Sequence, residues 1–184
     1  MPYQPLPKEL RAPKPASQHT QRAQAKVREE LNFDDRQSFE DARKGFIATI
    51  KPLTLHSEGG QITYDLERVS FLKEEAPDTV NPSLWRQAQL NAQHNGLYEI
   101  SDGLYQVRSF DIANMTLIRG RTGWIIVDPL TSSESSAAAL QLANEHLGER
   151  KVVAVIHSND LGKQSRHNES HVPLLVRVVG LRLL

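Results

Sequence analysis

Residues 124–157 read WIIVDPLTSSESSAAALQLANEHLGERKVVAVIH, and this stretch decides the fold class. Both of its ends, residues 124–128 and 151–157, are apolar without alternation. Such runs are typical of strands that are buried on both faces. Strand, helix and strand in this order predict a right-handed βαβ crossover and therefore a mixed α/β (α+β) domain.

The helix between these strands has signals at both ends. Ser132 or Ser133 can cap its start, and Gly148 can end it after residue 147. The apolar spacing predicts a buried face with one polar member, consisting of Ala137, Leu140, Ala143, Asn144 and Leu147.

Two further strands precede this unit, at residues 104–107 and 115–118, so an α/β domain opens at about residue 97. Before it lies a helical arm, in which we expect helices at 21–31 and 83–93, a strand at 61–66 and an irregular segment at 67–83. Another helix follows Asp34, with Phe39, Ala42 and Phe46 on one face. Ser83 is the expected cap of the 83–93 helix, with Leu84 and Ala88 on its buried side.

The chain therefore divides into four parts. Residues 1–20 carry five prolines, which predicts a disordered leader. Residues 21–96 form the helical arm, residues 97–158 the partial α/β domain, and residues 159–184 a tail of different character.

Composition excludes several classes of function. The 184 residues contain no cysteine, which excludes disulfides, zinc–thiolate sites and cysteine nucleophiles. Lys plus Arg equals Asp plus Glu, so charge gives no reason to expect nucleic acid as a partner. No signal peptide or membrane-spanning run is present, and we expect a cytoplasmic protein.

Four motifs in a fixed order resemble one known family. They are NPSLWRQ at 81–87, GLYQVR at 103–108, DIANMTLI at 111–118 and GWIIVDPL at 123–130. Together they resemble the alkylsulfatase branch of the metallo-β-lactamase superfamily over about residues 30–158. The resemblance implies a two-sheet αββα sandwich, of which only the first strands of one sheet would be present here. It also implies two zinc ions and an alkyl sulfate substrate such as dodecyl sulfate.

In that family, the strand matching residues 152–156 runs into a Thr-His-Ser-His-x-Asp-His segment that binds the zinc ions. Here residues 157–164 read HSNDLGKQ, so the His-x-His-x-Asp-His pattern is absent. We therefore predict no catalytic residue, no metal ligand and no bound zinc in this chain. The resemblance leaves Asp128 as a residue that braces the histidine loop, and His157 as a weak ligand candidate.

Other polar clusters are less promising. His167 and His171 would share a helical face, but Pro173 follows closely, and a solvated segment is the expected structure. Arg119 and Arg121 flank Gly120 at a hairpin and could meet a sulfate, although an exposed turn is the expected structure. The neighbouring carboxylates Asp34–Asp35 and Glu74–Glu75 are interpreted as surface charge.

The leading hypothesis is a truncated relative of a zinc-dependent alkyl sulfate ester hydrolase that is inactive on its own. One alternative is a fragment that pairs with a full-length homologue, for example by exchanging the arm, or that forms a homo-oligomer. Others are an enzyme that uses His157, His167 and His171, and an active alkylsulfatase whose true chain continues. A gene-model error, a splice form and a pseudogene are all open as origins of the tail. Because the facing sheet would be missing, we also expect Trp124, Ile126, Val153 and Val155 to be half exposed.

Overall fold

The computed structural model describes residues 14–158, so the tail and most of the leader lie outside the described residues. The first helix of the described residues, α2 (Gln18–Glu30), already begins inside the segment predicted to be a leader. Ser17 caps it, because its hydroxyl oxygen accepts a hydrogen bond from the backbone N–H of Thr20 at 3.1 Å.

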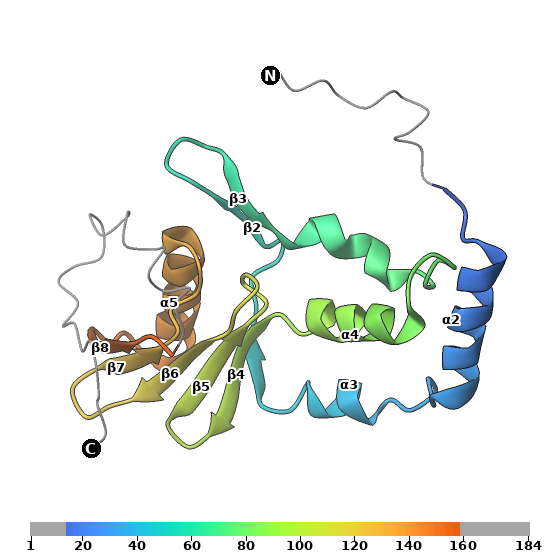
Figure 1. Ribbon diagram of the computed structural model, residues 1–184. Coiled ribbons are helices and arrows are strands. Elements are labelled where there is room, and N and C mark those ends of the chain that lie inside the picture. Colours follow the sequence, from blue (N-terminus) through green and yellow to red (C-terminus); the bar gives the residue numbers. More distant parts are fainter. Residues whose placement is uncertain (1–13, 159–184) are drawn as a thin grey trace, which may run out of the picture.

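A six-stranded sheet has the order β1-β4-β5-β6-β7-β8, and it lies to one side of the helices α2, α3 and α4 (Figure 1). All neighbours are antiparallel except β7 and β8, which run parallel as the βαβ prediction requires. The strands are β1 (Phe46–Ala48), β4 (Gly96–Ser101), β5 (Leu104–Arg108), β6 (Met115–Arg119), β7 (Trp124–Val127) and β8 (Val152–Ile156).

The mixed α/β class is confirmed, but the prediction of four strands was too small. Strands β1 and β4 were not predicted; they pair with each other at one end of the sheet. β1 has three residues, too few to show a period-2 pattern. β4 is buried over its first half and exposed over its second half, which also hides the alternation.

Helix α5 (Ser133–Leu147) covers one face of the sheet (Figure 1). Trp124 is 0% and Ile126 4% exposed on that face, so the expectation that both would be half exposed was wrong. Their cover is α5 itself, since the indole N–H of Trp124 donates to the side-chain oxygen of Asn144 at 2.9 Å. Val153 and Val155 are half-buried, as expected.

The buried face of α5 also differs from the predicted one. Its buried residues are Ser135, Ala139, Leu142 and Ala143. Ala137 is exposed, and Ser135 replaces it because its hydroxyl donates to the carbonyl of Phe110 at 3.0 Å. Apolar spacing could not anticipate a buried serine whose partner lies on another loop.

The opposite face of the sheet is partly open. Ile125 and Val127 alternate with the buried residues of β7 and are half-buried. On the same sheet, Ile118 is 36% and Ile156 42% exposed. Strand β7 is therefore fully covered on one face only, and β8, which has no buried residue, is fully covered on neither face.

The arm contains more β-structure than predicted. It includes α3 (Gln37–Asp41), the hairpin of β2 (Thr54–His56) and β3 (Ile62–Asp65), the 3-10 helix η1 (Leu66–Lys73) and α4 (Pro82–Gln93). Phe39 is buried on α3 as expected, but Phe46 belongs to β1. Asn81 caps α4 instead of Ser83, and Leu84 is 63% exposed.

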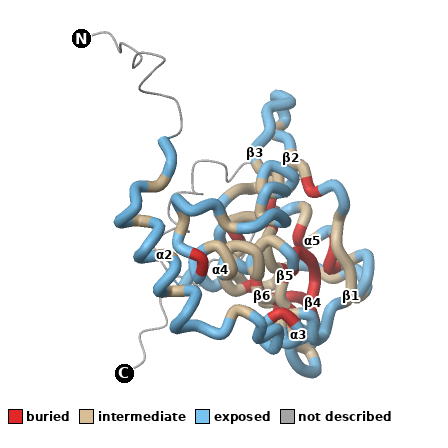
Figure 2. The backbone as a smooth tube through the Cα atoms, turned by 90° about the vertical axis from the view of Figure 1, so that its right-hand side faces the viewer, coloured by how far each residue is buried: buried red, intermediate tan, exposed pale blue. Residues whose placement is uncertain are grey.

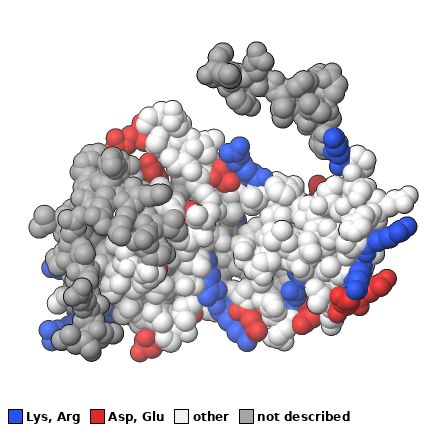
Figure 3. All heavy atoms as spheres, viewed as in Figure 1, with Lys and Arg blue, Asp and Glu red and all other residues white. Residues whose placement is uncertain are grey.

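The division at about residue 97 stays a prediction, although strand β1 of the arm lies within the sheet of the α/β part. Figure 2 shows α2 exposed along most of its length, whereas buried segments gather where the sheet meets α5. Basic and acidic side chains are intermixed on the face seen in Figure 3. Within residues 14–158, no helix is long and apolar enough to cross a membrane.

Candidate functional site

The candidate site lies where β7 and β8 end side by side. Val127 and Ile156 are the last paired residues of these parallel strands. The backbone N–H of Asp128 donates to the carbonyl of Ile156 at 2.9 Å, so the segments after both strands leave the sheet together. Polar residues that follow neighbouring parallel strands meet at such an edge.

The Asp128 carboxylate accepts two hydrogen bonds from the segment that follows β8. One of its carboxylate oxygens accepts a hydrogen bond from the backbone N–H of Ser158 at 2.7 Å, and the other accepts from the Ser158 hydroxyl at 2.5 Å. Both oxygens therefore hold one residue directly after His157. This geometry agrees with the bracing contact expected of Asp128, and its part in a metal site stays a prediction.

A second carboxylate, Asp111, was not singled out from the sequence. One of its oxygens accepts from the backbone N–H of Ala113 at 2.7 Å. The other accepts from the backbone N–H and the hydroxyl of Thr131, at 2.6 and 2.8 Å. Asp111 thus ties the β5–β6 loop to the loop that follows Asp128. Only the Asp111–Ala113 turn has a local signal in the sequence, since Thr131 is 20 residues away.

The backbone in these loops adopts an unusual conformation at three places. Ser109, Asp128 and Leu130 have φ values of 56°, 53° and 69°, the positive-φ non-glycine residues of the described chain. Such conformations cost free energy, and they cluster where the surrounding structure fixes a functional geometry. Their concentration beside the end of β8 supports this edge as the candidate site.

The arm hairpin and α5 hold the same loops in place. The hydroxyl of Tyr64 on β3 donates to the carbonyl of Ser109 at 3.2 Å. Burial raises the pKa of this hydroxyl, and the Asp111 carboxylate raises it further, so the group stays a hydrogen-bond donor. From α5, the Ser136 hydroxyl donates to the carbonyl of Pro129.

The donors at this edge do not fit a metal centre. Both oxygens of Asp128 are hydrogen-bonded to Ser158, and His157 is a single exposed imidazole. Residues 14–158 contain no group of three or more His, Cys, Asp or Glu side chains that could hold a metal ion. His167 and His171 lie outside the described residues.

The remaining predicted residues are not brought to this edge. Arg119 pairs with Trp124, which places it at the start of β7, at the opposite end of the strand from Asp128. Its guanidinium lies 5.0 Å from the ring centre of Tyr105. Arg121 is exposed in the turn between these strands. Arg119 and Arg121 are both exposed at this turn, away from the Asp128 edge.

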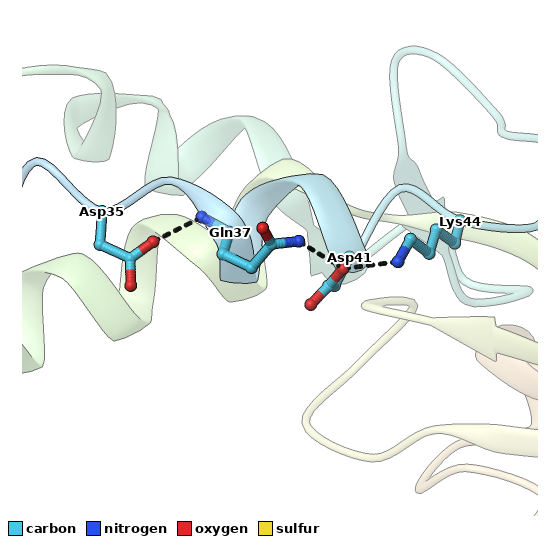
Figure 4. A network of polar contacts seen from close by, with 4 residues as sticks. All are labelled: Asp35, Gln37, Asp41 and Lys44. Atoms are coloured by element: carbon cyan, nitrogen blue, oxygen red, sulfur yellow. Dashed lines mark hydrogen bonds and ion pairs between the residues drawn. The ribbon is translucent and has the colours of Figure 1, made fainter.

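The neighbouring carboxylates are surface groups, as interpreted from the sequence. Asp35 accepts from the backbone N–H of Gln37 at 2.8 Å, and the Gln37 amide donates to Asp41 at 2.9 Å (Figure 4). Lys44 completes this exposed chain with an ion pair to Asp41 at 2.7 Å. Hydrogen bonds from Lys44 and Gln37 lower the pKa of Asp41. Glu74 and Glu75 are also exposed.

Comparison with known proteins points to one family. A family model described as the metallo-beta-lactamase superfamily matches residues 108–159. A linear primary-alkylsulfatase of a Pseudomonas species is 46% identical over 148 residues, which cover 79% of this chain and 22% of that protein. An alkyl/aryl-sulfatase, BDS1, of Saccharomyces cerevisiae is 43% identical over 141 residues, 76% of this chain and 22% of that protein.

A solved structure agrees with these sequence matches. The stereoselective inverting sec-alkylsulfatase Pisa1 from a Pseudomonas species superposes with a TM-score of 0.70 at 45% identity. The match covers 77% of this chain and 22% of that one. The chain thus spans about a fifth of the length of the relatives that it matches. The residues matched by the family model include Asp111, Asp128 and Ser158.

Proposed function

Because the chain belongs to the alkylsulfatase branch of the metallo-β-lactamase superfamily, we propose that residues 14–158 form the opening part of an alkyl sulfate ester hydrolase domain. We further propose that the 184-residue chain hydrolyses no alkyl sulfate by itself. In this proposal the chain supplies a scaffold that consists of a sheet, one covering helix and the Asp128 clamp. The Asp128 clamp is the pair of hydrogen bonds that Ser158, after β8, donates to the Asp128 carboxylate.

The single observation that supports this proposal is the sequence of the residues that follow β8. The residues that follow are His157, Ser158 and Asn159, and the His-x-His-x-Asp-His ligand pattern is not among them. One imidazole and a carboxylate already bonded to Ser158 cannot replace three or four zinc ligands. The clamp is therefore present without the ligands that it would brace.

A sulfate-release assay tests the lack of activity. The purified chain, given zinc and dodecyl sulfate, should release no more sulfate than buffer does. The Pseudomonas linear primary-alkylsulfatase, assayed in parallel, is the positive control. Turnover by the 184-residue chain that a chelator abolishes would show that the proposal is wrong.

A chimaera tests the scaffold role separately. Residues 30–156 of this chain would replace the matching segment of the Pseudomonas enzyme, which then supplies its own ligands and remaining domains. We expect a zinc-binding, active chimaera, because the segment keeps the strands and Asp128, while the enzyme supplies the segment after β8 that Asp128 would hold. Asp128→Ala in the chimaera should lower activity and zinc content, whereas Asp35→Ala on the exposed arm should change neither.

A second candidate function is pairing with a full-length homologue. The partly open sheet face and β8, the last strand in the sheet order of residues 14–158, favour it. Co-expression of the tagged chain with a full-length alkylsulfatase should then yield a stable complex on gel filtration. Separate elution of the two proteins at micromolar concentration would exclude this function.

A further inference from the structure

A hollow of about 440 Å³ lies between η1, α4 and the segment that joins β1 to β2. Its volume falls in the range of natural small-molecule sites. The apolar part of its lining consists of Ile50, Leu53, Leu66, Val69, Leu72 and Ala92. None of the residues at the Asp128 edge lines it, so it is a separate feature of the chain.

The geometry of η1 explains why one wall is apolar. A 3-10 helix has three residues per turn, so residues three apart lie above one another. Leu66, Val69 and Leu72 follow this spacing and line the hollow together. Each is half-buried, so the stripe is not fully covered by other parts of the described chain. The segment at 67–83 was predicted to be irregular, and η1 occupies only its first part, up to Lys73.

Hydrogen bonds between the walls keep the hollow open in a defined shape. The Gln89 amide on α4 donates to the carbonyl of Leu72 at 2.7 Å. The backbone N–H of Leu66 donates to the carbonyl of Leu53 at 3.0 Å. A site whose walls are already joined loses little conformational entropy when a ligand binds.

The rim of the hollow is polar and carries a net positive charge. Lys51 and Lys73 both line it, and Glu67 is the acidic residue of the lining. Both lysines are exposed, and neither forms an ion pair with a carboxylate of residues 14–158. Two ammonium groups above an apolar floor complement a ligand that has a hydrocarbon chain and a negative head.

We propose that this hollow binds an anionic amphiphile, with its alkyl chain on the apolar floor and its sulfate or carboxylate head beside Lys51 and Lys73. The site is distinct from the edge at which the family's chemistry is expected. Its occupation requires no metal and no turnover, so it stands whether or not the chain hydrolyses alkyl sulfates.

Titration of tryptophan fluorescence tests the proposal with monomeric decyl sulfate and decanoate, on the 184-residue chain at submicromolar concentration, below the level at which we expect it to aggregate. We expect saturable binding of both at one site per chain. Ethyl sulfate, which lacks the chain, and decyltrimethylammonium, which reverses the charge, should bind at least on the order of tenfold more weakly. Decanoate has no ester to hydrolyse, so this measurement cannot be confused with the sulfate-release assay.

Variants locate the binding site. Lys51→Gln with Lys73→Gln should weaken binding by about fivefold or more. Lys26→Gln with Lys151→Gln, on exposed lysines outside the hollow, is the matched control and should change nothing. Ala92→Phe should fill the floor and abolish binding. Gln93→Glu, an exposed rim change that leaves the floor intact, should weaken binding even if Ala92→Phe does not fold.

Three results would overturn the proposal. Equal binding of decyltrimethylammonium would show that the head charge is not recognised. Equal weakening by the control pair of lysine variants would show non-specific adsorption. Absence of binding together with a higher melting temperature for Ala92→Phe would show that the hollow is a packing gap.

Discussion

At the scale of single residues, Asp128 has the most specific environment in the candidate site. Its φ of 53° suits few side chains, and its carboxylate holds both polar groups of Ser158. Asn and Asp tolerate this conformation better than other non-glycine residues because their side chains bond locally. The residue type and the strained turn thus depend on each other.

The first prediction concerns this clamp. Asp128→Ala should lower the free energy of unfolding by about 1–3 kcal/mol, since it removes two charge-assisted hydrogen bonds and leaves alanine at positive φ. Asp128→Asn keeps the conformation and one acceptor and should cost less. Urea denaturation measures the differences. Ser158→Ala removes one bond only, and a larger effect for it than for Asp128→Ala would contradict the clamp.

His94 provides the second prediction. It is 7% exposed, and its Nε2 atom has no hydrogen-bond partner among residues 14–158. Burial lowers the pKa of His94, and the guanidinium groups of Arg43 and Arg108 lower it further. The folded pKa then lies below the unfolded value of about 6.5, so the unfolded chain binds the proton more readily.

The stability that neutral His94 contributes is therefore complete above about pH 6.5 and decreases as the pH falls toward the folded pKa. The melting temperature should drop between about pH 7.5 and pH 5.5, and His94→Asn should make this dependence shallower. His146→Asn, at an exposed histidine of α5, is the control. An unchanged pH profile for His94→Asn would exclude this histidine as the cause.

At the scale of elements, the sequence predicted the strands with long apolar runs and the helices with clear caps. β5 to β8, α4 and α5 were found because burial and capping leave a local pattern. Three elements were missed because they leave no such pattern. β1 has only three residues, β4 is buried over one half only, and the 3-10 helix η1 has a period of three residues. The bonds from Asp111 to Thr131 and from Tyr64 to Ser109 span 20 and 45 residues, so spacing could not reveal them.

The third prediction concerns how β1 joins the sheet. A Cβ atom at Gly45 would lie 1.9 Å from the carbonyl oxygen of Glu99, at the β1–β4 junction. Gly60 has a similar φ, 77° against 73°, but open space around it. Both Gly→Ala changes should cost about 1–2 kcal/mol for the backbone conformation. Gly45→Ala should cost more and should increase amide exchange in β1, whereas equal losses would contradict the described junction.

At the scale of the whole molecule, one sheet face is covered by α5 and the other is partly open. A sheet that presents apolar residues on its open face needs a partner layer or tends to associate. We therefore expect the isolated chain to bind the dye anilinonaphthalene sulfonate and to aggregate at micromolar concentration. A dye-negative monomer with a sharp thermal transition would show that residues 14–158 complete the fold better than their exposed isoleucines indicate.

The fourth prediction separates the two faces with neighbouring residues. Ile118 is 36% exposed, and Leu117 is fully buried on the α5 face. Ile118→Thr should reduce dye binding and change the free energy of unfolding by less than about 1 kcal/mol. Leu117→Thr should cost about 2–4 kcal/mol, because it leaves a cavity and a buried hydroxyl. Similar costs for both variants would show that the two faces are equally covered.

The order of the strands in the sheet also determines the order in which they can pair during synthesis. β4 to β7 are neighbours both along the chain and in the sheet, so each hairpin can close over a short loop as the chain leaves the ribosome. β1 emerges much earlier, but Phe46 pairs with Tyr98 and must wait for β4 to be synthesised. The arm is thus synthesised well before the strand that anchors it to the sheet, while β8 can join β7 only after α5 is complete.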